Sequence, residues 1–185
     1  MLRFAALLRL TVKMKASRFT SLVLPLRDRM FRYARSLVLS QAEAEDAVCD
    51  LVERLWLERS RLASCRNVEA FVMTAVRNRC YDLLRQRRAE ERRKKAVSSW
   101  SERSAAGDAE GWETRELVRR AMASLPDKQR EVLHLKEIEG YPTGEIAAMI
   151  GCSEAQVRTI LSRARGALRE ILKKMMDDEC RTRAD

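Results

Sequence analysis

The sequence predicts an all-α protein made of two small helical domains joined by a flexible linker. Its 185 residues include only six Gly and three Pro, while Ala, Leu, Arg and Glu, which favour helices, are abundant. Apolar residues recur at helical spacing through two regions, about residues 15–90 and 113–174. Between them, residues 96–112 are rich in Ser, Ala and Gly and nearly lack aliphatic side chains. Because such a segment cannot bury a core, we expect a linker over 91–112.

The charge balance indicates a polyanionic partner. The formal net charge is +10 and the pI is about 9.8, which suits nucleic acid or an anionic membrane surface. Five Cys residues form no C-x-x-C pair, and His134 is the single histidine. A disulfide scaffold or a zinc site is therefore not expected, and the thiols suit a reducing, cytoplasmic location.

No stretch reaches the roughly 20 apolar residues of a membrane span. The first 15 residues, MLRFAALLRLTVKMK, resemble a short signal peptide, but Arg9 interrupts the apolar run and no cleavage site follows. We expect an amphipathic first helix or a start at Met14 instead. Trp100 and Trp112 are unusual in a linker, and we expect them to pack on a domain or a partner.

A helix with one acidic face is predicted after residue 40. Ser40 and Glu43 form a capping box that opens a helix through Trp56. On a helical wheel, apolar residues cluster on one side and four acids lie on the other: Glu43, Asp46, Asp50 and Glu53. These acids repel one another and would repel DNA, so we interpret them as a surface for a basic protein partner. The alternative is a solvated face.

An enzyme that uses these carboxylates as metal ligands is a third interpretation. The acids lie on a single exposed helix without converging partners, and no nucleophile–base pair stands elsewhere in the sequence. We therefore expect no catalytic residues, no metal ligands and no cofactor.

The next helix has a face suited to single-stranded DNA. Asn67 can cap a helix from Val68 to about Arg88. One face gathers aromatic, amide and charged side chains: Phe71, Asn78, Tyr81, Asp82, Arg85 and Arg88. Unstacked bases stack on aromatic rings while cations hold the phosphates. The alternative is an amphipathic helix whose aromatic side chains are buried.

Residues 143–168, TGEIAAMIGCSEAQVRTILSRARGAL, predict a helix-turn-helix. We expect Thr143 to cap a short helix that ends at Gly151, and Ser153 to cap the second helix with Gln156. The apolar residues of the second helix share one face: Val157, Ile160, Leu161, Ala164 and Leu168. The other side carries Arg158, Thr159, Ser162, Arg163 and Arg169, which could enter a major groove. The alternative is an ordinary helical hairpin, and residues 176–185 are expected to be a frayed tail.

The C-terminal region resembles the C-terminal domain of the sigma-70 family of bacterial transcription initiation factors. The matching residues are Leu125-Pro126, Glu139-Gly140, Glu145-Ile146-Ala147, Val157 and Arg163-Ala164-Arg165. In that family this domain binds the promoter −35 element. The resemblance implies that the recognition helix reads DNA with Arg158, Thr159, Ser162, Arg163 and Arg165.

AEDAVCDLVERLW and AFVMTAVRNRCYDLLRQRR resemble the N-terminal core domain of the same family. There the acidic helix binds the clamp helices of the RNA polymerase largest subunit, and the following helix recognises and melts the −10 element. The direct linker, without a third domain, resembles the extracytoplasmic-function group. Phe71 stands where many members have Trp, and residues 62–67 match no strong pattern.

The resemblance implies a non-enzymatic initiation subunit whose partners are core RNA polymerase, promoter DNA and, as for many relatives, an anti-sigma factor. A free-standing helix-turn-helix regulator is the alternative function. It would need its own dimer interface or sensory domain, and residues 15–90 show no βα alternation of a receiver domain.

Overall fold

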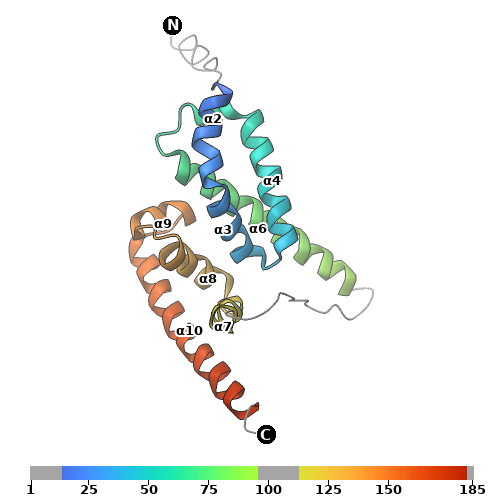
Figure 1. Ribbon diagram of the computed structural model, residues 1–185, viewed down its shortest axis with the longest axis vertical. Coiled ribbons are helices and arrows are strands. Elements are labelled where there is room, and N and C mark those ends of the chain that lie inside the picture. The colour runs from blue at the N-terminus through green and yellow to red at the C-terminus, as the bar shows by residue number, and fades with distance from the viewer. Residues whose placement is uncertain (1–13, 96–112, 183–185) are drawn as a thin grey trace. The chain divides into compact units, whose positions relative to one another are not determined.

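The computed structural model describes residues 14–95 and 113–182, and every regular element in these ranges is helical (Figure 1). The expectations for the first helix, for the linker residues 96–112 and for Trp100 and Trp112 fall outside the described residues. The chain folds as two units, with the boundary between Leu83 and Leu84. The all-α prediction is confirmed.

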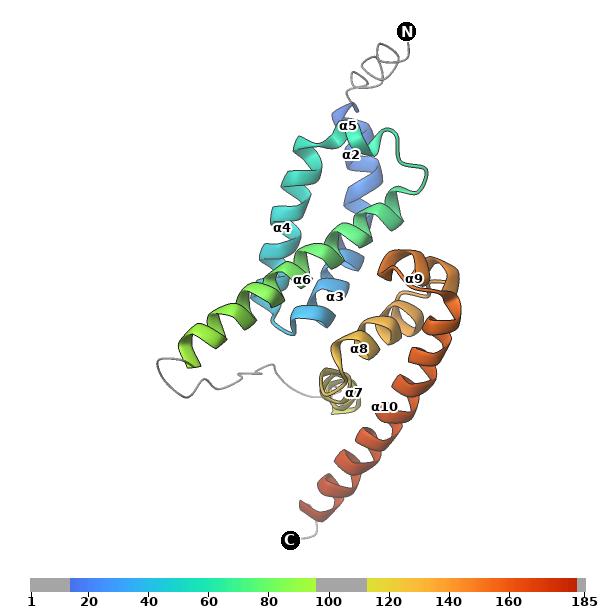
Figure 2. The ribbon, with the colours of Figure 1, turned by 180° about the vertical axis from the view of Figure 1, so that it is seen from behind.

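The N-terminal unit is a bundle built on α3 (Arg27–Val38) and α4 (Gln41–Leu57). It also contains α2 (Ala16–Val23), the 3₁₀ turn η2 (Leu24–Leu26), α5 (Arg59–Leu62) and the first part of α6 (Val68–Lys95). α3 and α4 pack side by side, and Figure 2 shows α6 crossing both of them. Ion pairs join α6 to α3 through Arg29–Glu69 and to α4 through Arg79–Asp50.

Local signals set the ends of these helices. The N–H of Glu43 donates to Ser40 Oγ at 3.4 Å, which is the Ser40 half of the predicted capping box. The N–H of Ala70 donates to Asn67 Oδ1 at 2.9 Å, so Asn67 caps α6 as expected. α6 extends to Lys95 rather than ending near Arg88. α3 ends at Val38 and its C-cap is Leu39, whose φ of 61° lies in the left-handed region that glycine usually occupies.

The C-terminal unit is organised by one long helix, α10 (Glu154–Thr182). Against it pack α7 (Glu113–Ala123), α8 (Asp127–Leu133) and α9 (Thr143–Ile150) (Figure 1). A π-helical turn, η3 (His134–Ile138), continues directly from α8. The core includes Leu135, Ile146, Val157 and Ala164, all buried. The expected frayed tail from residue 176 is wrong, because the helix runs on to Thr182.

The helix-turn-helix forms, with one correction. Gly151 adopts a φ of 71° and ends α9, since a residue without a Cβ tolerates this conformation. The N–H of Ser153 donates to Gln156 Oε1 at 3.0 Å and the N–H of Gln156 donates to Ser153 Oγ at 3.3 Å, so this capping box is confirmed. Thr143 does not cap α9. The cap position is Pro142, and the Thr143 hydroxyl instead donates to Glu154 Oε2 on α10 at 3.2 Å.

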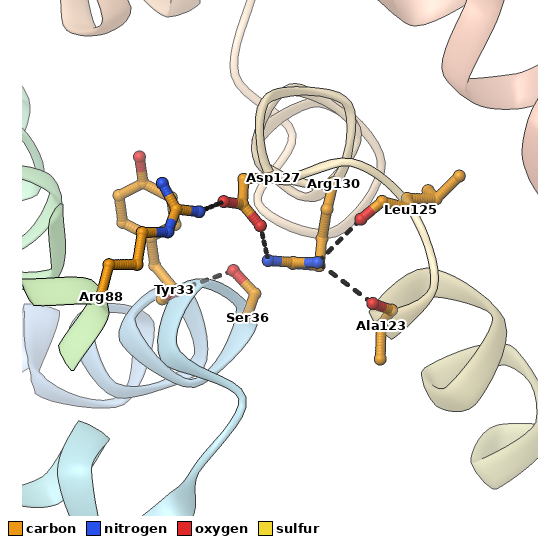
Figure 3. Close-up of polar contacts among 7 residues, drawn as sticks. All are labelled: Tyr33, Ser36, Arg88, Ala123, Leu125, Asp127 and Arg130. Carbon is orange, nitrogen blue, oxygen red and sulfur yellow. Dashed lines mark hydrogen bonds and ion pairs between the residues drawn. The ribbon is translucent and has the colours of Figure 1, made fainter. Parts of the chain in front are cut away.

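Arg130 fixes the turn between α7 and α8. Its side chain is 4% exposed, and its guanidinium donates to the carbonyl oxygens of Ala123 and Leu125 at 3.2 and 2.9 Å. It also donates to Asp127 Oδ1 at 2.8 Å (Figure 3). A buried cation is tolerated because these three acceptors replace its hydration shell.

We expect Arg130→Met to destabilise the α7–α8 turn by about 2–3 kcal/mol, because two carbonyls and one carboxylate lose a charged donor. Hydrogen exchange of the α7 and α8 amides in the full chain measures this opening free energy locally. Lys128→Met, at an exposed position of α8, is the matched control and should have little effect. Equal protection in the two variants would contradict the role assigned to Arg130.

Candidate functional site

The acidic face of α4 comprises Glu43, Asp46, Asp50 and Glu53. The opposite side of the helix supplies core residues: Ala44, Ala47, Val48, Leu51 and Leu55 are all buried. Since these five positions fix the rotation of the helix, the acids point outward, and Asp46, Asp50 and Glu53 are exposed while Glu43 is half-buried. The outward orientation that the sequence predicted for these residues is therefore present.

One member of the acidic face has an intramolecular partner that was not predicted from the sequence. Arg79 Nη2 of α6 lies 2.8 Å from Asp50 Oδ2, with the two side chains 20% and 49% exposed. Within the part of the chain that the structure describes, neither Asp46 nor Glu53 has an ion pair. The sequence did hold a sign that Arg79 has a partner. At about 100° per residue, Arg79 lies on the same side of α6 as the apolar residues Val72, Val76 and Leu83. An arginine on an inward face needs an acid.

The outer face of α6 is formed by the residues predicted to contact single-stranded DNA. Asn78, Asp82, Arg85 and Arg88 are exposed, and Phe71 and Tyr81 are half-buried. The guanidinium carbon of Arg77 lies 4.6 Å from the centroid of the Tyr81 ring, a cation–π geometry. Arg77 was not among the predicted residues, although it precedes Tyr81 by one helical turn. It restrains the ring and adds positive charge beside it.

The reading face of α10 is the exposed side of the second helix of the helix-turn-helix. Val157, Leu161 and Ala164 are buried, and the predicted DNA-binding residues Arg158, Thr159, Ser162, Arg163 and Arg165 are all exposed. The hydroxyl of Thr159 donates to the carbonyl of Ala155 at 3.0 Å. This hydrogen bond to the helix backbone sets the side-chain rotamer of Thr159 and therefore the position of its methyl group. The alternation of buried and exposed positions matches the predicted wheel.

Carboxylates hold two arginines of the reading face. Arg158 Nη2 lies 3.0 Å from Glu154 Oε2, one turn earlier in α10. Arg165 Nε and Nη2 lie 3.1 and 2.6 Å from Glu137 Oε1 of η3. The hydrogen bonds from Arg158 and then from Thr143 hold the pKa of Glu154 below its ordinary value. Neither glutamate was assigned a role from the sequence.

A shallow recess lies along the reading face. Four cationic side chains line it, together with Thr143, Leu161, Ser162 and Gly166: Lys136, Arg158, Arg165 and Arg169. Lys136 comes from η3 and the three arginines from α10, so the turn and the helix meet in one electropositive surface. Lys136 was missed because its place depends on the π-helical turn, for which the sequence gives no signal. Such a surface suits phosphate oxygens and base edges.

Neither a metal centre nor a membrane span is found in the described parts of the chain. Within residues 14–95 and 113–182, no cluster of three or more His, Cys, Asp or Glu side chains could hold a metal ion. Among the helices described, none combines the length and apolar character that crossing a membrane requires.

Two family models match the chain. Sigma-70 region 2 matches residues 22–90, which include α4 and most of α6, and sigma-70 region 4 matches residues 115–168, which include the helix-turn-helix. These are the two regions that contain the acidic face, the outer face of α6 and the reading face.

Curated relatives and solved structures agree with these matches. The chain is 30% identical to the RNA polymerase sigma-E factor of Streptomyces coelicolor over 146 residues, which cover 78% of this chain and 80% of the relative. It is 28% identical to the extracytoplasmic-function sigma factor SigL of Mycobacterium tuberculosis over 152 residues, or 79% of this chain and 84% of that one. The sigma factor RpoE of Bartonella quintana, solved with the anti-sigma factor NepR, superposes with a TM-score of 0.71 and 26% identity. That superposition covers 84% of this chain and 96% of RpoE.

The Asp50–Arg79 ion pair makes the stability of the fold sensitive to charge reversal at Asp50. Asp50→Lys would put a second cation beside Arg79, so we expect it to destabilise the chain by about 1 kcal/mol. Thermal unfolding followed by circular dichroism should show a melting temperature about 4–8 °C lower. Glu53→Lys, on the same face but without such a partner among the described residues, is the control and should melt near the wild type. Identical melting of both variants would show that the pair contributes nothing.

Proposed function

The chain belongs to the sigma-70 family, in its extracytoplasmic-function group, and from that premise we propose that three of its helices divide the steps of initiation. As a sigma factor it is not an enzyme: it binds core RNA polymerase and directs it to promoter DNA. We assign core polymerase to the acidic face of α4, the −10 element to the outer face of α6, and the −35 element to the reading face of α10. We place this activity in the cytoplasm.

The acidic face is the observation that carries this proposal. In a chain of net charge +10, an exposed row of acids costs DNA affinity, so a surface that only bound DNA would gain nothing from it. If the partner is a basic protein surface, the same row of acids attracts it, orients the two proteins and speeds their association. A free-standing helix-turn-helix regulator has no use for such a face, and the match to sigma-70 region 2 over residues 22–90 is to a domain that such a regulator lacks.

The outer face of α6 supports a role in DNA melting. It combines an aromatic ring at Tyr81, cations at Arg77 and Arg85 and an amide at Asn78, all on one helix. A base that leaves the duplex loses a few kcal/mol of stacking and pairing energy. Stacking of that base on an aromatic side chain recovers about 1–3 kcal/mol. The cations hold the phosphates on either side of that base. Capture of the unpaired strand is therefore a role that these side chains can perform.

The domain limits follow the same division. We propose residues 15–90 as the unit for core polymerase and the −10 element, and residues 113–174 as the unit for the −35 element, joined through 91–112. The first residues of that joining segment, 91–95, belong to α6, which runs to Lys95. An anti-sigma factor is a further proposed partner, because the related RpoE was solved with one.

Reversal of the acidic face should abolish assembly with core polymerase. We expect Asp46→Lys with Glu53→Lys to weaken core binding by about 2–4 kcal/mol, or roughly 30- to 1000-fold, because two attractions become repulsions. Asp50 is left unchanged so that its pair with Arg79 persists. Fluorescence anisotropy of the labelled chain titrated with core polymerase measures the affinity.

The matched control is Asp28→Lys with Glu45→Lys, which changes the net charge by the same amount at exposed positions outside the acidic face. This control should bind core polymerase as the wild type does. Full binding by the Asp46/Glu53 variant would make the acidic face a solvated surface and remove the main support for its assignment.

Loss of the outer face of α6 should block promoter opening and spare closed-complex formation. Ala variants of Asn78, Tyr81 and Arg85 should lower permanganate reactivity of thymines near the −10 element about tenfold or more on linear duplex. A template with a pre-formed bubble should restore transcription, because the cost of unpairing is already met. Arg87→Ala, on the opposite side of α6, is the control. Wild-type thymine reactivity in the three variants would refute this assignment.

A further inference from the structure

Glu154 is the feature of the reading face that a DNA-binding role alone does not explain. It places a negative charge beside Arg158 and Thr143, two of the residues that line the electropositive recess where phosphate oxygens are expected to approach. A carboxylate in that position lowers the affinity for any DNA sequence. Its contacts show what it does instead.

Three observations separate Glu154 from an ordinary surface acid. Its Oε2 accepts hydrogen bonds from Arg158 Nη2 at 3.0 Å and from the Thr143 hydroxyl at 3.2 Å. The two donors come from different helices, α10 and α9. A Cβ added at Gly144 would lie 3.0 Å from Glu154 Oε1. The absence of a side chain at position 144 therefore leaves room for the carboxylate.

The exposed Glu154–Arg158 pair adds little to stability. The two side chains are 49% and 67% exposed, and i,i+4 ion pairs of this kind contribute only slightly in water. The geometry matters more than the energy, because Thr143 fixes the carboxylate and the carboxylate restrains one end of a long, flexible arginine. One N–H of Arg158 Nη2 is used by Glu154. The other N–H groups of its guanidinium have no partner among the described residues, so they can donate to the paired acceptors of a guanine edge.

We propose that Glu154 is a positioning residue that sets sequence specificity at the −35 element by orienting Arg158. This inference rests on the proposed function of α10 as the promoter-reading helix. A pre-oriented arginine loses less rotamer freedom when it contacts the correct base. The carboxylate also weakens binding wherever no base contact compensates for it, so it widens the difference between correct and incorrect sequences.

The test is selection of promoter DNA by holoenzyme from a duplex library with a randomised upstream block, followed by sequencing. Four holoenzymes are compared with the wild type: Glu154→Gln, Arg158→Ala, the double variant, and Glu170→Gln. Glu170 is an exposed acid more than four turns further along α10, so Glu170→Gln controls for the change in net charge.

We expect Glu154→Gln to reduce base preference about tenfold, at the same base pairs that Arg158→Ala affects and at no others. The double variant should match Arg158→Ala, because Glu154 acts through that side chain. Binding to duplex without an enriched sequence should stay the same or tighten. Glu170→Gln should select as the wild type does.

Gly144→Ala provides a second variant that leaves both charges in place. The added methyl group would push the carboxylate of Glu154 away by a few tenths of an ångström, while alanine favours the helix more than glycine does. We expect this variant to lose the same base preference while its melting temperature stays level or rises. A role of Glu154 in folding alone would instead lower the melting temperature and weaken all sequences equally.

The possible failures are distinguishable. If the wild-type holoenzyme enriches no upstream sequence, the proposed function of α10 is wrong. If the wild type enriches a sequence and Glu154→Gln enriches it equally, the positioning role is wrong although the proposed function stands. A loss in Glu154→Gln at base pairs that Arg158→Ala leaves unchanged, or a further loss in the double variant, also overturns the inference.

Discussion

The burial of Val157, Leu161 and Ala164 is the constraint on which the C-terminal unit depends. These residues lie on the side of α10 that packs with α8 and α9, and their positions fix the rotation of the helix about its axis. A rotation of one residue, about 100°, would bury arginines and expose the apolar row. The cost of burying unpaired cations excludes that register. The outward direction of the reading face is thus a consequence of core packing.

The same constraint operates in α4, with the opposite charge. Five buried apolar positions set the rotation, and the acids occupy what remains. In both helices an ion pair also joins the exposed charged face to a neighbouring element: Asp50 pairs with Arg79 of α6, and Arg165 pairs with Glu137 of η3. Exposed pairs contribute little to folding. They do restrict side-chain rotamers before a partner arrives, which lowers the entropy lost on binding.

Local chemistry explains how much of this fold the sequence predicts. Ser40, Asn67, Gly151 and the Ser153–Gln156 box act within one helical turn, and each is found in the structure where its residue type predicts. The rotation of α4 and α10 was predictable because it depends only on apolar spacing. Contacts between helices were not predictable in this way. The partners Glu154 of Thr143 and Arg79 of Asp50 are 11 and 29 residues away, so no local pattern pairs them.

Three features of the fold had no sequence signal at all. Leu39 adopts a left-handed φ without a glycine, which a packed bundle can impose against local preference. The π-helical turn of η3 places Lys136 and Glu137 beside α10. A π-helical turn differs from an α-helical turn by one additional residue, and no residue type in the sequence indicates it. The extension of α10 to Thr182 was missed because residues 176–182 combine both charge signs without a clear apolar stripe.

Arg158, Arg163 and Arg165 show that the reading face combines two kinds of cation. Arg158 and Arg165 are held by carboxylates, whereas Arg163 has no ion pair among the residues described. A cation without a carboxylate gives affinity to any phosphate, and affinity of that kind falls as salt rises. A cation paired with a carboxylate is partly neutralised and its side chain can adopt fewer positions. Its contribution to DNA affinity therefore depends on a matching base. On the proposed function of α10, general attraction to DNA and discrimination between sequences would therefore fall to different side chains of one helix.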